Sequence, residues 1–220
     1  MRHLFFDIDG TLLTAPGVGV KALEEAMRSE FALSGPDCDL EFGGKTDRDL
    51  VSQLLRRNGL PNSEENRGRV RKRYSLALRG HLTREAGRTH PGVLELLVAL
   101  EPRTDLGVHV MTGNFPETAR MKLETFDLIS YFSRVIGGDL DERRDDLARR
   151  ALRQLERSGP VTDVIVIGDT ANDVRCAKAI GARCLAVCTG SGSRAELESA
   201  GAERVVADLT DPSVLPFLTD

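Results

Sequence analysis

The chain has 220 residues, 40% of them hydrophobic, so it is long enough for one large domain or two small ones with a substantial core. Its 30 basic and 34 acidic side chains leave a formal charge of −4, which gives no general attraction to nucleic acid or anionic membranes. No apolar run is long enough to span a membrane, and the first residues lack a secretory signal, so a cytoplasmic location is expected. Any affinity for anions must therefore be local.

Short runs of β-branched and aromatic residues alternate with longer segments of helical period. This pattern is typical of a parallel sheet covered by helices, and it predicts an α/β fold. Each strong strand candidate is followed by small, polar or charged residues. The strands are expected at residues 4–6, 108–111, 134–136, 164–167 and 184–187, with a weaker one at 205–206.

The segment between the first two expected strands is far longer than a crossover needs and has helical periodicity throughout. It predicts a separate helical cap formed by residues 15–89, inserted into a core formed by residues 1–14 and 90–220. Linkers that contain glycine and proline, at 13–19 and 85–92, would let the cap hinge. Three apolar stripes are expected to form its core: Val20, Leu23, Met27 and Phe31; Leu50, Val51, Leu54 and Leu55; and Val70, Tyr74, Ala77, Leu78 and Leu82.

Two helix starts in the cap carry capping signals. Thr46 and Asp49 resemble a capping box, and Asn62 or Ser63 is placed to cap the next helix. Residues 62–84 carry seven basic and two acidic side chains. A run of this kind is usually a solvated helix face, and the alternative is electrostatic attraction of an anionic substrate.

Polar residues follow three of the expected strands, at the edge where an open parallel sheet binds its ligands. Taken singly, each has an ordinary alternative as a turn, strand-end or helix-start residue. Together, their carboxylates would repel one another unless a cation neutralised them, and an all-oxygen set favours magnesium. The residues are Asp7, Asp9 and Thr11 after the first strand, Thr112, Gly113 and Asn114 after the second, and Asp169 and Asp173 after the fourth.

These motifs resemble those of the haloacid dehalogenase superfamily. FFDIDGTLL is similar to its first motif, VMTGN to its second and VIGDTANDV to its fourth. GGKTD, HPGV and KLETFDLISYF are similar to the branch with a helical cap, which contains phosphoglycolate phosphatase-like and β-phosphoglucomutase-like enzymes. The resemblance covers nearly the whole chain. It implies a doubly wound, mostly parallel Rossmann-like sheet with an inserted helical cap.

The resemblance also implies a magnesium-dependent phosphatase that acts on a small phosphorylated metabolite. Asp7 would be the nucleophile, which becomes transiently phosphorylated, and Asp9 the general acid and base. Thr112 would hydrogen-bond the transferred phosphoryl group. Mg²⁺ would be held by the Asp7 side chain, the Asp9 backbone carbonyl and the Asp169 side chain, with Asp173 as a further ligand or a supporting residue.

Further substrate contacts follow from the same motifs. Thr11, Gly113 and Asn114 are expected to bind the substrate in the core. In the cap, GGKTD resembles the specificity loop of the branch, so Lys45 and Arg48 are expected to contact the substrate. The alternative for these two is an ordinary loop lysine and an ordinary helix-start arginine.

One motif departs from the family pattern. The family supplies a lysine ahead of the fourth motif, and this chain has no lysine between Glu124 and Val174. Arg144 is the expected substitute, ahead of Arg143, although both could lie on a solvated helix start. Lys122 is expected on the protein surface.

The same motifs allow three alternatives to a phosphatase. A dehalogenase would need neither Asp9 nor the magnesium cluster. A phosphomutase of the β-phosphoglucomutase type remains an alternative, because it differs only in whether the cap excludes water and recaptures an intermediate. A non-catalytic binding module that retains the fold is disfavoured because both aspartates of the first motif are present. The sequence indicates no oligomeric state.

Overall fold

A computed structural model describes residues 1–220 and contains a six-stranded sheet with the strand order β5-β4-β1-β6-β7-β8. All its strand pairs are parallel, and the order reverses on either side of β1. The predicted α/β fold is confirmed, and every expected strand is present. The strands are β1 (Arg2–Phe6), β4 (Leu106–Met111), β5 (Arg134–Ile136), β6 (Asp163–Gly168), β7 (Arg183–Val187) and β8 (Arg204–Val206).

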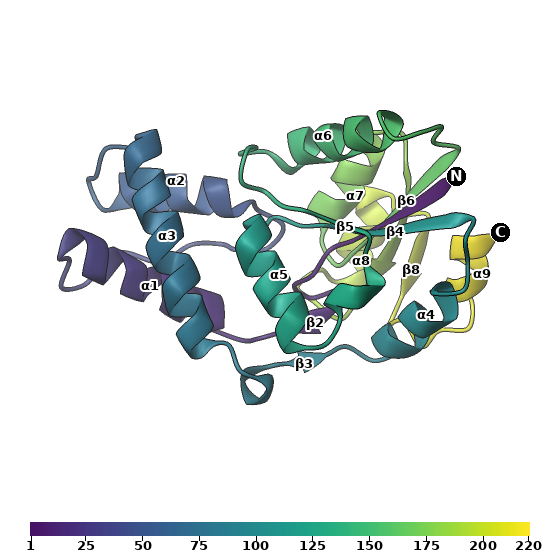
Figure 1. The fold of residues 1–220 in the computed structure, drawn as a ribbon, viewed down its shortest axis with the longest axis horizontal. Helices are drawn as coiled ribbons and strands as arrows, with labels where there is room; N and C mark the ends of the chain where they lie inside the picture. The colour runs from purple at the N-terminus through teal and green to yellow at the C-terminus, as the bar shows by residue number, and fades with distance from the viewer.

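Helices cover both faces of this sheet because alternate strand residues point to opposite sides. Leu4 and Phe6 of β1 pack into one apolar cluster, and Phe5 packs into another. Figure 1 shows α6 and α7 above the sheet, with α4 and α9 below it. The first cluster involves α4 (Val93–Leu100), α5 (Pro116–Thr125), η2 (Ile129–Tyr131) and α9 (Val214–Thr219), and the second involves α6 (Arg144–Glu156), α7 (Ala171–Ala179) and α8 (Arg194–Ala200).

Three helices form a body with its own buried cluster, next to the carboxyl ends of the strands (Figure 1). They are α1 (Val18–Phe31), α2 (Asp47–Arg57) and α3 (Glu64–His81). The three predicted apolar stripes supply most of this cluster. Val20 is an exception at 36% exposed, because it borders a cavity and not the helical core.

The N-terminal caps of α2 and α3 test two predictions: a capping box formed by Thr46 and Asp49, and a cap from Asn62 or Ser63. Thr46 accepts a hydrogen bond from the Asp49 backbone, but the Asp49 carboxylate accepts one from Gln53 and does not complete a capping box. Ser63 caps α3. None of the helices is long and apolar enough to cross a membrane.

The two chain segments between the sheet and the helical body lie side by side. β2 (Leu13–Thr14) and β3 (Arg88–Thr89) pair in antiparallel register, and the 3₁₀ turn η1 (Arg84–Ala86) precedes β3. A Cβ at Gly87 would lie 2.3 Å from the Thr14 carbonyl, so the close approach of these segments requires glycine there.

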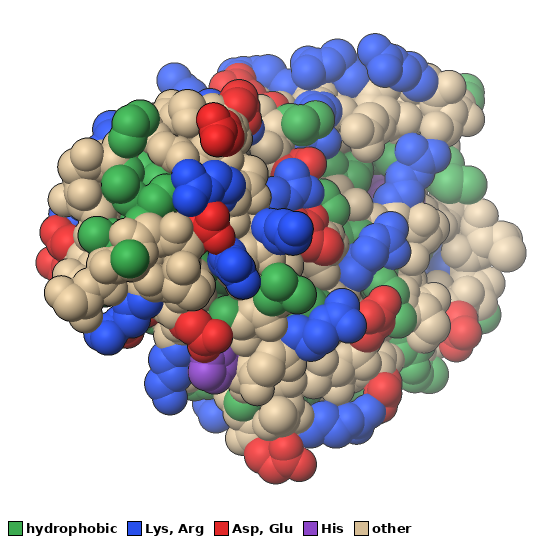
Figure 2. Space-filling model, turned by 60° about the vertical axis from the view of Figure 1, so that its left-hand side comes forward, with side chains coloured by type: hydrophobic (Ala, Val, Ile, Leu, Met, Phe, Trp, Pro, Cys, Tyr) green, Lys and Arg blue, Asp and Glu red, His purple; other side chains and the backbone are tan.

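Four of the six Lys and Arg side chains of α3 are paired with carboxylates. Arg69 and Arg73 both bind Glu30 of α1, at 2.7 and 2.8 Å. Arg71 binds Glu117 of α5 at 2.6 Å. Figure 2 shows blue and red side chains intermixed over this face of the molecule. The run therefore serves as a paired, solvated helix face, because none of its basic residues lines the cavity described below.

Candidate active site

Asp7 and Asp9 lie in the turn directly after the central strand β1. The backbone N–H of Asp7 still donates to Ile167 of β6, at 2.9 Å, so the Asp7 side chain is placed by the sheet itself. Gly10 has a φ of +82°, and a Cβ there would lie 2.5 Å from the Asp169 carboxylate. Glycine at this position therefore allows the turn after β1 to lie close to Asp169, at the end of β6.

Three carboxylates come together at this edge of the sheet. One ligand oxygen each from Asp7, Asp169 and Asp173 lie within 4.8 Å of one another, and all three residues are buried. Asp169 follows β6 and accepts a hydrogen bond from the Ser191 backbone at 2.9 Å. Asp173 stands in the first turn of α7, where it forms a capping box with Thr170.

The electrostatics of this cluster show an excess of buried negative charge. Burial raises the pKa of Asp169 to about 8, and the charges of Asp173 and Asp7 add to the rise. Burial likewise raises the pKa of Asp7 to about 6, although Arg144 opposes the rise. The Asp7 Oδ1 atom is buried and has no hydrogen-bond partner. These carboxylate oxygens match the ligands that Mg²⁺ prefers, so the residues fit a divalent cation.

Arg144 lies against this cluster, at the start of α6. Its guanidinium donates to Asp173 Oδ1 at 2.5 Å and lies 3.4 Å from Asp7 Oδ1, while its Nε atom has no partner. Only 5% of its side chain is exposed. The Arg143 side chain is 75% exposed and pairs with Asp145 instead. Of the two arginines considered from the sequence, the structure thus brings Arg144 to the acidic cluster.

The loop after β4 supplies polar groups beside the acidic cluster. Thr112 is fully buried, and its hydroxyl accepts hydrogen bonds from the Asn114 side chain at 2.8 Å and the Asn114 backbone at 3.3 Å. The Asn114 amide also donates to Asp9 at 2.7 Å. Thr11, in the turn after β1, is fully buried, donates to Asp169 at 3.3 Å and does not line the cavity, so its expected contact with the substrate is wrong. Gly113 lines the cavity, where a side chain would collide with the Lys45 carbonyl.

Lys122 is not on the surface, so that expectation is wrong. The residue is 6% exposed, and its ammonium group donates to both oxygens of Asp9 and to the Asn114 side-chain oxygen, each at 2.7 Å. Burial acts to raise the pKa of Asp9, but Lys122 and Asn114 outweigh it and lower that pKa. A signal was present in the sequence, because helical spacing places Lys122 on the same face as Thr118 and Ala119, both fully buried.

The cap loop contributes differently from what its sequence suggests. Lys45 lines the cavity, with its ammonium 3.4 Å from Gln53. Arg48 does not line it, because its guanidinium is bound by Glu64 and by the Asp139 carbonyl at 3.3 Å. Arg48 therefore does not reach the position expected of a substrate-contacting residue.

Asp47, which the sequence did not single out, lies between these two residues and is 8% exposed. Its carboxylate accepts a hydrogen bond from the Phe115 backbone at 2.8 Å, and its own N–H donates to the Gly113 carbonyl at 2.7 Å. Burial raises the pKa of Asp47 to about 6. The cap thus binds the loop after β4 directly, which no local sequence pattern reveals.

The polar groups from both parts of the chain line one cavity of about 520 Å³. Asp7, Thr112 and Arg144 lie at its sheet side. Residues of the helical body, among them Leu23 and Tyr74, line the opposite side. The cavity is large enough for a small organic molecule placed between the sheet edge and the helices.

A doubly wound sheet with an acidic cavity at its carboxyl edge, beneath a helical body, defines an α/β enzyme of the capped type. The model of one family, "Haloacid dehalogenase-like hydrolase", matches residues 4–187. The chain belongs to this family, as its motifs predicted, and it is a hydrolase of the phosphatase type.

Known proteins similar to the chain agree with this assignment. The phosphoglycolate phosphatase of Salmonella typhimurium (strain LT2) is 27% identical over 199 residues, which cover 82% of this chain and 79% of that protein. The probable phosphatase IndB of Dickeya dadantii is 28% identical over 210 residues, covering 92% and 88%. The structure of CbbY from Rhodobacter sphaeroides, solved in complex with phosphate, shares the fold with a TM-score of 0.74 and 21% identity, covering 97% and 98%.

Proposed function

We propose that the protein is a magnesium-dependent phosphatase that hydrolyses a small phosphate monoester through an aspartyl phosphate formed on Asp7. The observation that supports this most strongly is the buried cluster of Asp7, Asp169 and Asp173, whose ligand oxygens lie within 4.8 Å of one another. Asp7 also has an oxygen, Oδ1, that accepts no hydrogen bond and has only the Arg144 guanidinium nearby, at 3.4 Å, at the wall of a cavity.

Asp7 and Asp9 would carry out the two chemical steps. In the first, an Asp7 oxygen forms a bond to phosphorus, the bond from phosphorus to the leaving oxygen breaks, and Asp9 gives its proton to that oxygen. In the second, a water molecule gives a proton to Asp9 and attacks phosphorus, and the bond to Asp7 breaks. Inorganic phosphate leaves, and both aspartates return to their starting states.

The side chains of Asp7 and Asp169 and the Asp9 backbone carbonyl would hold Mg²⁺, with Asp173 as a further ligand or a support. The ion would neutralise charge, so that an anionic carboxylate can approach an anionic phosphate. Both oxygens of Asp173 already accept hydrogen bonds, from Arg144 and from Thr170. Asp173 therefore has less capacity left for a direct contact than Asp7 has.

Four groups would hold the phosphoryl oxygens. Arg144 is fixed by Asp173 and retains an Nε without a partner, so it can bind an incoming anion without losing its anchor. Thr112, Gly113 and Asn114 would contribute donors at the start of α5. Residues 15–89, including Lys45, would act as the cap that encloses the organic part of a small phosphorylated metabolite.

A phosphatase assay tests this proposal. Purified protein should hydrolyse 4-nitrophenyl phosphate with Mg²⁺ present, and EDTA should stop the reaction. Asp7→Asn should lose nearly all activity, while Asp39→Asn should retain it because the Asp39 side chain is 97% exposed. Equal phosphate release by wild type and Asp7→Asn would exclude Asp7 as the nucleophile.

A further inference from the structure

Lys122, in the last turn of α5, makes an unusual set of contacts. Its ammonium has three N–H donors, and three acceptors lie at 2.7 Å: both oxygens of Asp9 and the side-chain oxygen of Asn114. Only 8% of the Lys122 side chain is exposed, whereas the Asp9 side chain is 47% exposed at the cavity. Both residues line the cavity, so the lysine holds Asp9 through both carboxylate oxygens while nearly half of the Asp9 side chain stays open to a ligand.

The same ammonium connects Asp9 to the loop after β4. Asn114 accepts from Lys122 and donates to both Asp9 and Thr112, at 2.7 and 2.8 Å. The four side chains thus form one continuous network across the ends of β1 and β4. A shift of Lys122 would move Asp9 relative to Thr112, because no other cation is hydrogen-bonded to the Asp9 carboxylate.

Lys122 and Arg144 serve different carboxylates. Arg144 binds Asp173 and lies 3.4 Å from Asp7, whereas Lys122 binds Asp9 alone among the acidic side chains. Without Lys122, the Asp9 carboxylate would be drawn toward any cation in the cluster or repelled from an anionic substrate. The two cations therefore keep the carboxylates of the first motif in separate positions.

We propose that Lys122 is a positioning residue for proton transfer: it holds the Asp9 carboxylate against the Thr112–Asn114 loop, facing the leaving oxygen. This inference rests on the proposed phosphatase function. It adds a residue from α5 to those that support catalysis. It also predicts a dependence of the rate on the leaving group, which a lysine with only a structural role would not cause. Loss of Lys122 should affect only those steps in which Asp9 moves a proton.

Substrates with different leaving groups distinguish the steps that need proton transfer by Asp9 from those that do not. A 4-nitrophenolate departs without a proton, so Asp9 is unimportant for the first bond cleavage and is needed only when water attacks the aspartyl phosphate. An alkoxide, as from ethyl phosphate, must receive the Asp9 proton when its bond to phosphorus breaks. General acid catalysis of this kind contributes about 10²–10⁴-fold in rate.

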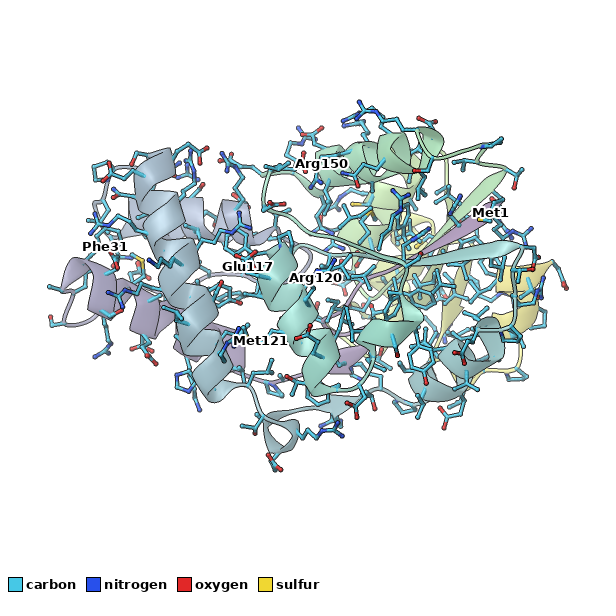
Figure 3. The ribbon with its side chains drawn as sticks, viewed as in Figure 1. Met1, Phe31, Glu117, Arg120, Met121 and Arg150 are labelled. Atoms are coloured by element: carbon cyan, nitrogen blue, oxygen red, sulfur yellow. The ribbon has the colours of Figure 1, made fainter.

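The experiment uses the full chain with Mg²⁺ and rapid-quench mixing. Lys122→Met removes the three hydrogen bonds and keeps the side-chain length, and Lys122→Arg restores a cation. Arg120→Met is the matched control, since Arg120 is exposed on the same helix (Figure 3). Thermal melting of each variant, followed by circular dichroism, establishes that it is folded.

With 4-nitrophenyl phosphate, we expect Lys122→Met to release the first equivalent of nitrophenol at the wild-type rate, while its steady-state kcat falls and phosphoenzyme accumulates. With ethyl phosphate, the first turnover itself should slow by about 10²-fold. Lys122→Arg should recover part of the loss, and Arg120→Met should match wild type. If Lys122→Met does not fold, the same comparison of first turnovers is made with Lys122→Arg, whose loss should again be confined to ethyl phosphate.

Equal slowing of both first turnovers, or no slowing of either, would overturn the role of Lys122. That failure is distinguishable from failure of the proposed function. If the function is wrong, wild type releases no nitrophenol with Mg²⁺ present, or Asp7→Asn releases it equally fast. If only this inference is wrong, wild type releases nitrophenol, Asp7→Asn does not, and the Lys122 variants give the same loss in the first turnover with both substrates.

Discussion

Asp7 and Asp9 are separated by one residue, yet their surroundings are opposite. Asp7 is buried among other carboxylates, and burial raises its pKa to about 6. Asp9 opens onto the cavity and is held by Lys122, which helps to lower its pKa against the effect of burial. The intervening Ile8 is fully buried and directs the two side chains to different surroundings. The two carboxylates of the first motif therefore differ in charge environment and in exposure to the cavity.

The position of Asp169 depends on a glycine distant in the sequence. A Cβ at Gly190 would lie 1.8 Å from Asp169 Oδ2, so Gly190→Ala must displace this carboxylate. We expect the Mg²⁺ concentration for half-maximal activity to rise by about tenfold, within the range seen when groups that orient a metal ligand are lost. A Mg²⁺ titration at fixed substrate measures it. Gly35→Ala is the control, since a Cβ there meets nothing within 4 Å; an unchanged titration for Gly190→Ala would contradict the assignment of Asp169.

At the scale of elements, strand and helix positions could be predicted because hydrophobic period and strand-end residues are local properties. Side-chain direction could not. Arg48 stands at a helix start near the cavity, but Glu64 and the Asp139 carbonyl draw it away. Lys122 was expected outside, although its helical phase with Thr118 and Ala119 indicated burial. The residues that bind the Arg48 and Lys122 side chains come from other parts of the chain, so local sequence does not show in which direction these side chains point.

Two glycines, one inside α3 and one before it, allow a matched pair of alanine substitutions. Gly68 lies in α3 and Gly59 precedes it with a φ of +69°, and a Cβ at either position meets nothing within 4 Å. Gly68→Ala should stabilise the protein by about 0.5–1 kcal/mol, because alanine has the better helix propensity. Gly59→Ala should destabilise it by about 1–2 kcal/mol, because its backbone is left-handed. Urea unfolding measures both, and a gain in stability for Gly59→Ala would contradict this backbone conformation.

The cap and the core are joined at Asp47. Phe115 is the residue before α5 begins, and Asp47→Ala leaves its N–H without an acceptor. We expect this to loosen the loop after β4, which contains Thr112, Gly113 and Asn114. We expect KM for 4-nitrophenyl phosphate to rise by about tenfold, in keeping with roughly 1–3 kcal/mol for a buried donor left unpaired. Asp47→Asn should rescue binding, since its amide oxygen can accept the same bond. If Asp47→Ala raises KM no more than the control Asp49→Ala does, this contact does not support substrate binding.

At the scale of the whole molecule, ion pairs bridge the helical body and the sheet domain around the cavity. Glu117 of α5 binds Arg71 of α3 at 2.6 Å, and Figure 3 shows Glu117 in the space between the two helices. The pair is more than one-third exposed on both sides, so it contributes little to stability. The fold therefore depends on the three apolar clusters and not on this pair.

His3 and His109 form a buried titratable pair on the neighbouring strands β1 and β4. His109 bonds His3 at 2.9 Å and Ser133 at 2.8 Å, and burial, with the charges of His3 and Arg134, lowers the His109 pKa to about 4. The unfolded value is 6.5, so the neutral ring stabilises the fold fully above pH 6.5. This contribution is lost as the pH falls toward 4.

The pH dependence of unfolding tests this effect. The urea midpoint of wild type should fall between pH 7.5 and pH 5.0, and His109→Gln, which has no titrating ring, should show a smaller fall over the same interval. An equal fall in both proteins would mean that other groups account for the acid sensitivity.

The most direct test of the central claim is a crystal structure of the protein grown with Mg²⁺ and beryllium fluoride, which imitates a phosphoryl group on a carboxylate. The account predicts beryllium bonded to an Asp7 oxygen, Mg²⁺ in contact with both Asp7 and Asp169, and Thr112 and Arg144 donating to the fluorides. Beryllium on any other residue, or Mg²⁺ bound away from Asp7 and Asp169, would contradict it.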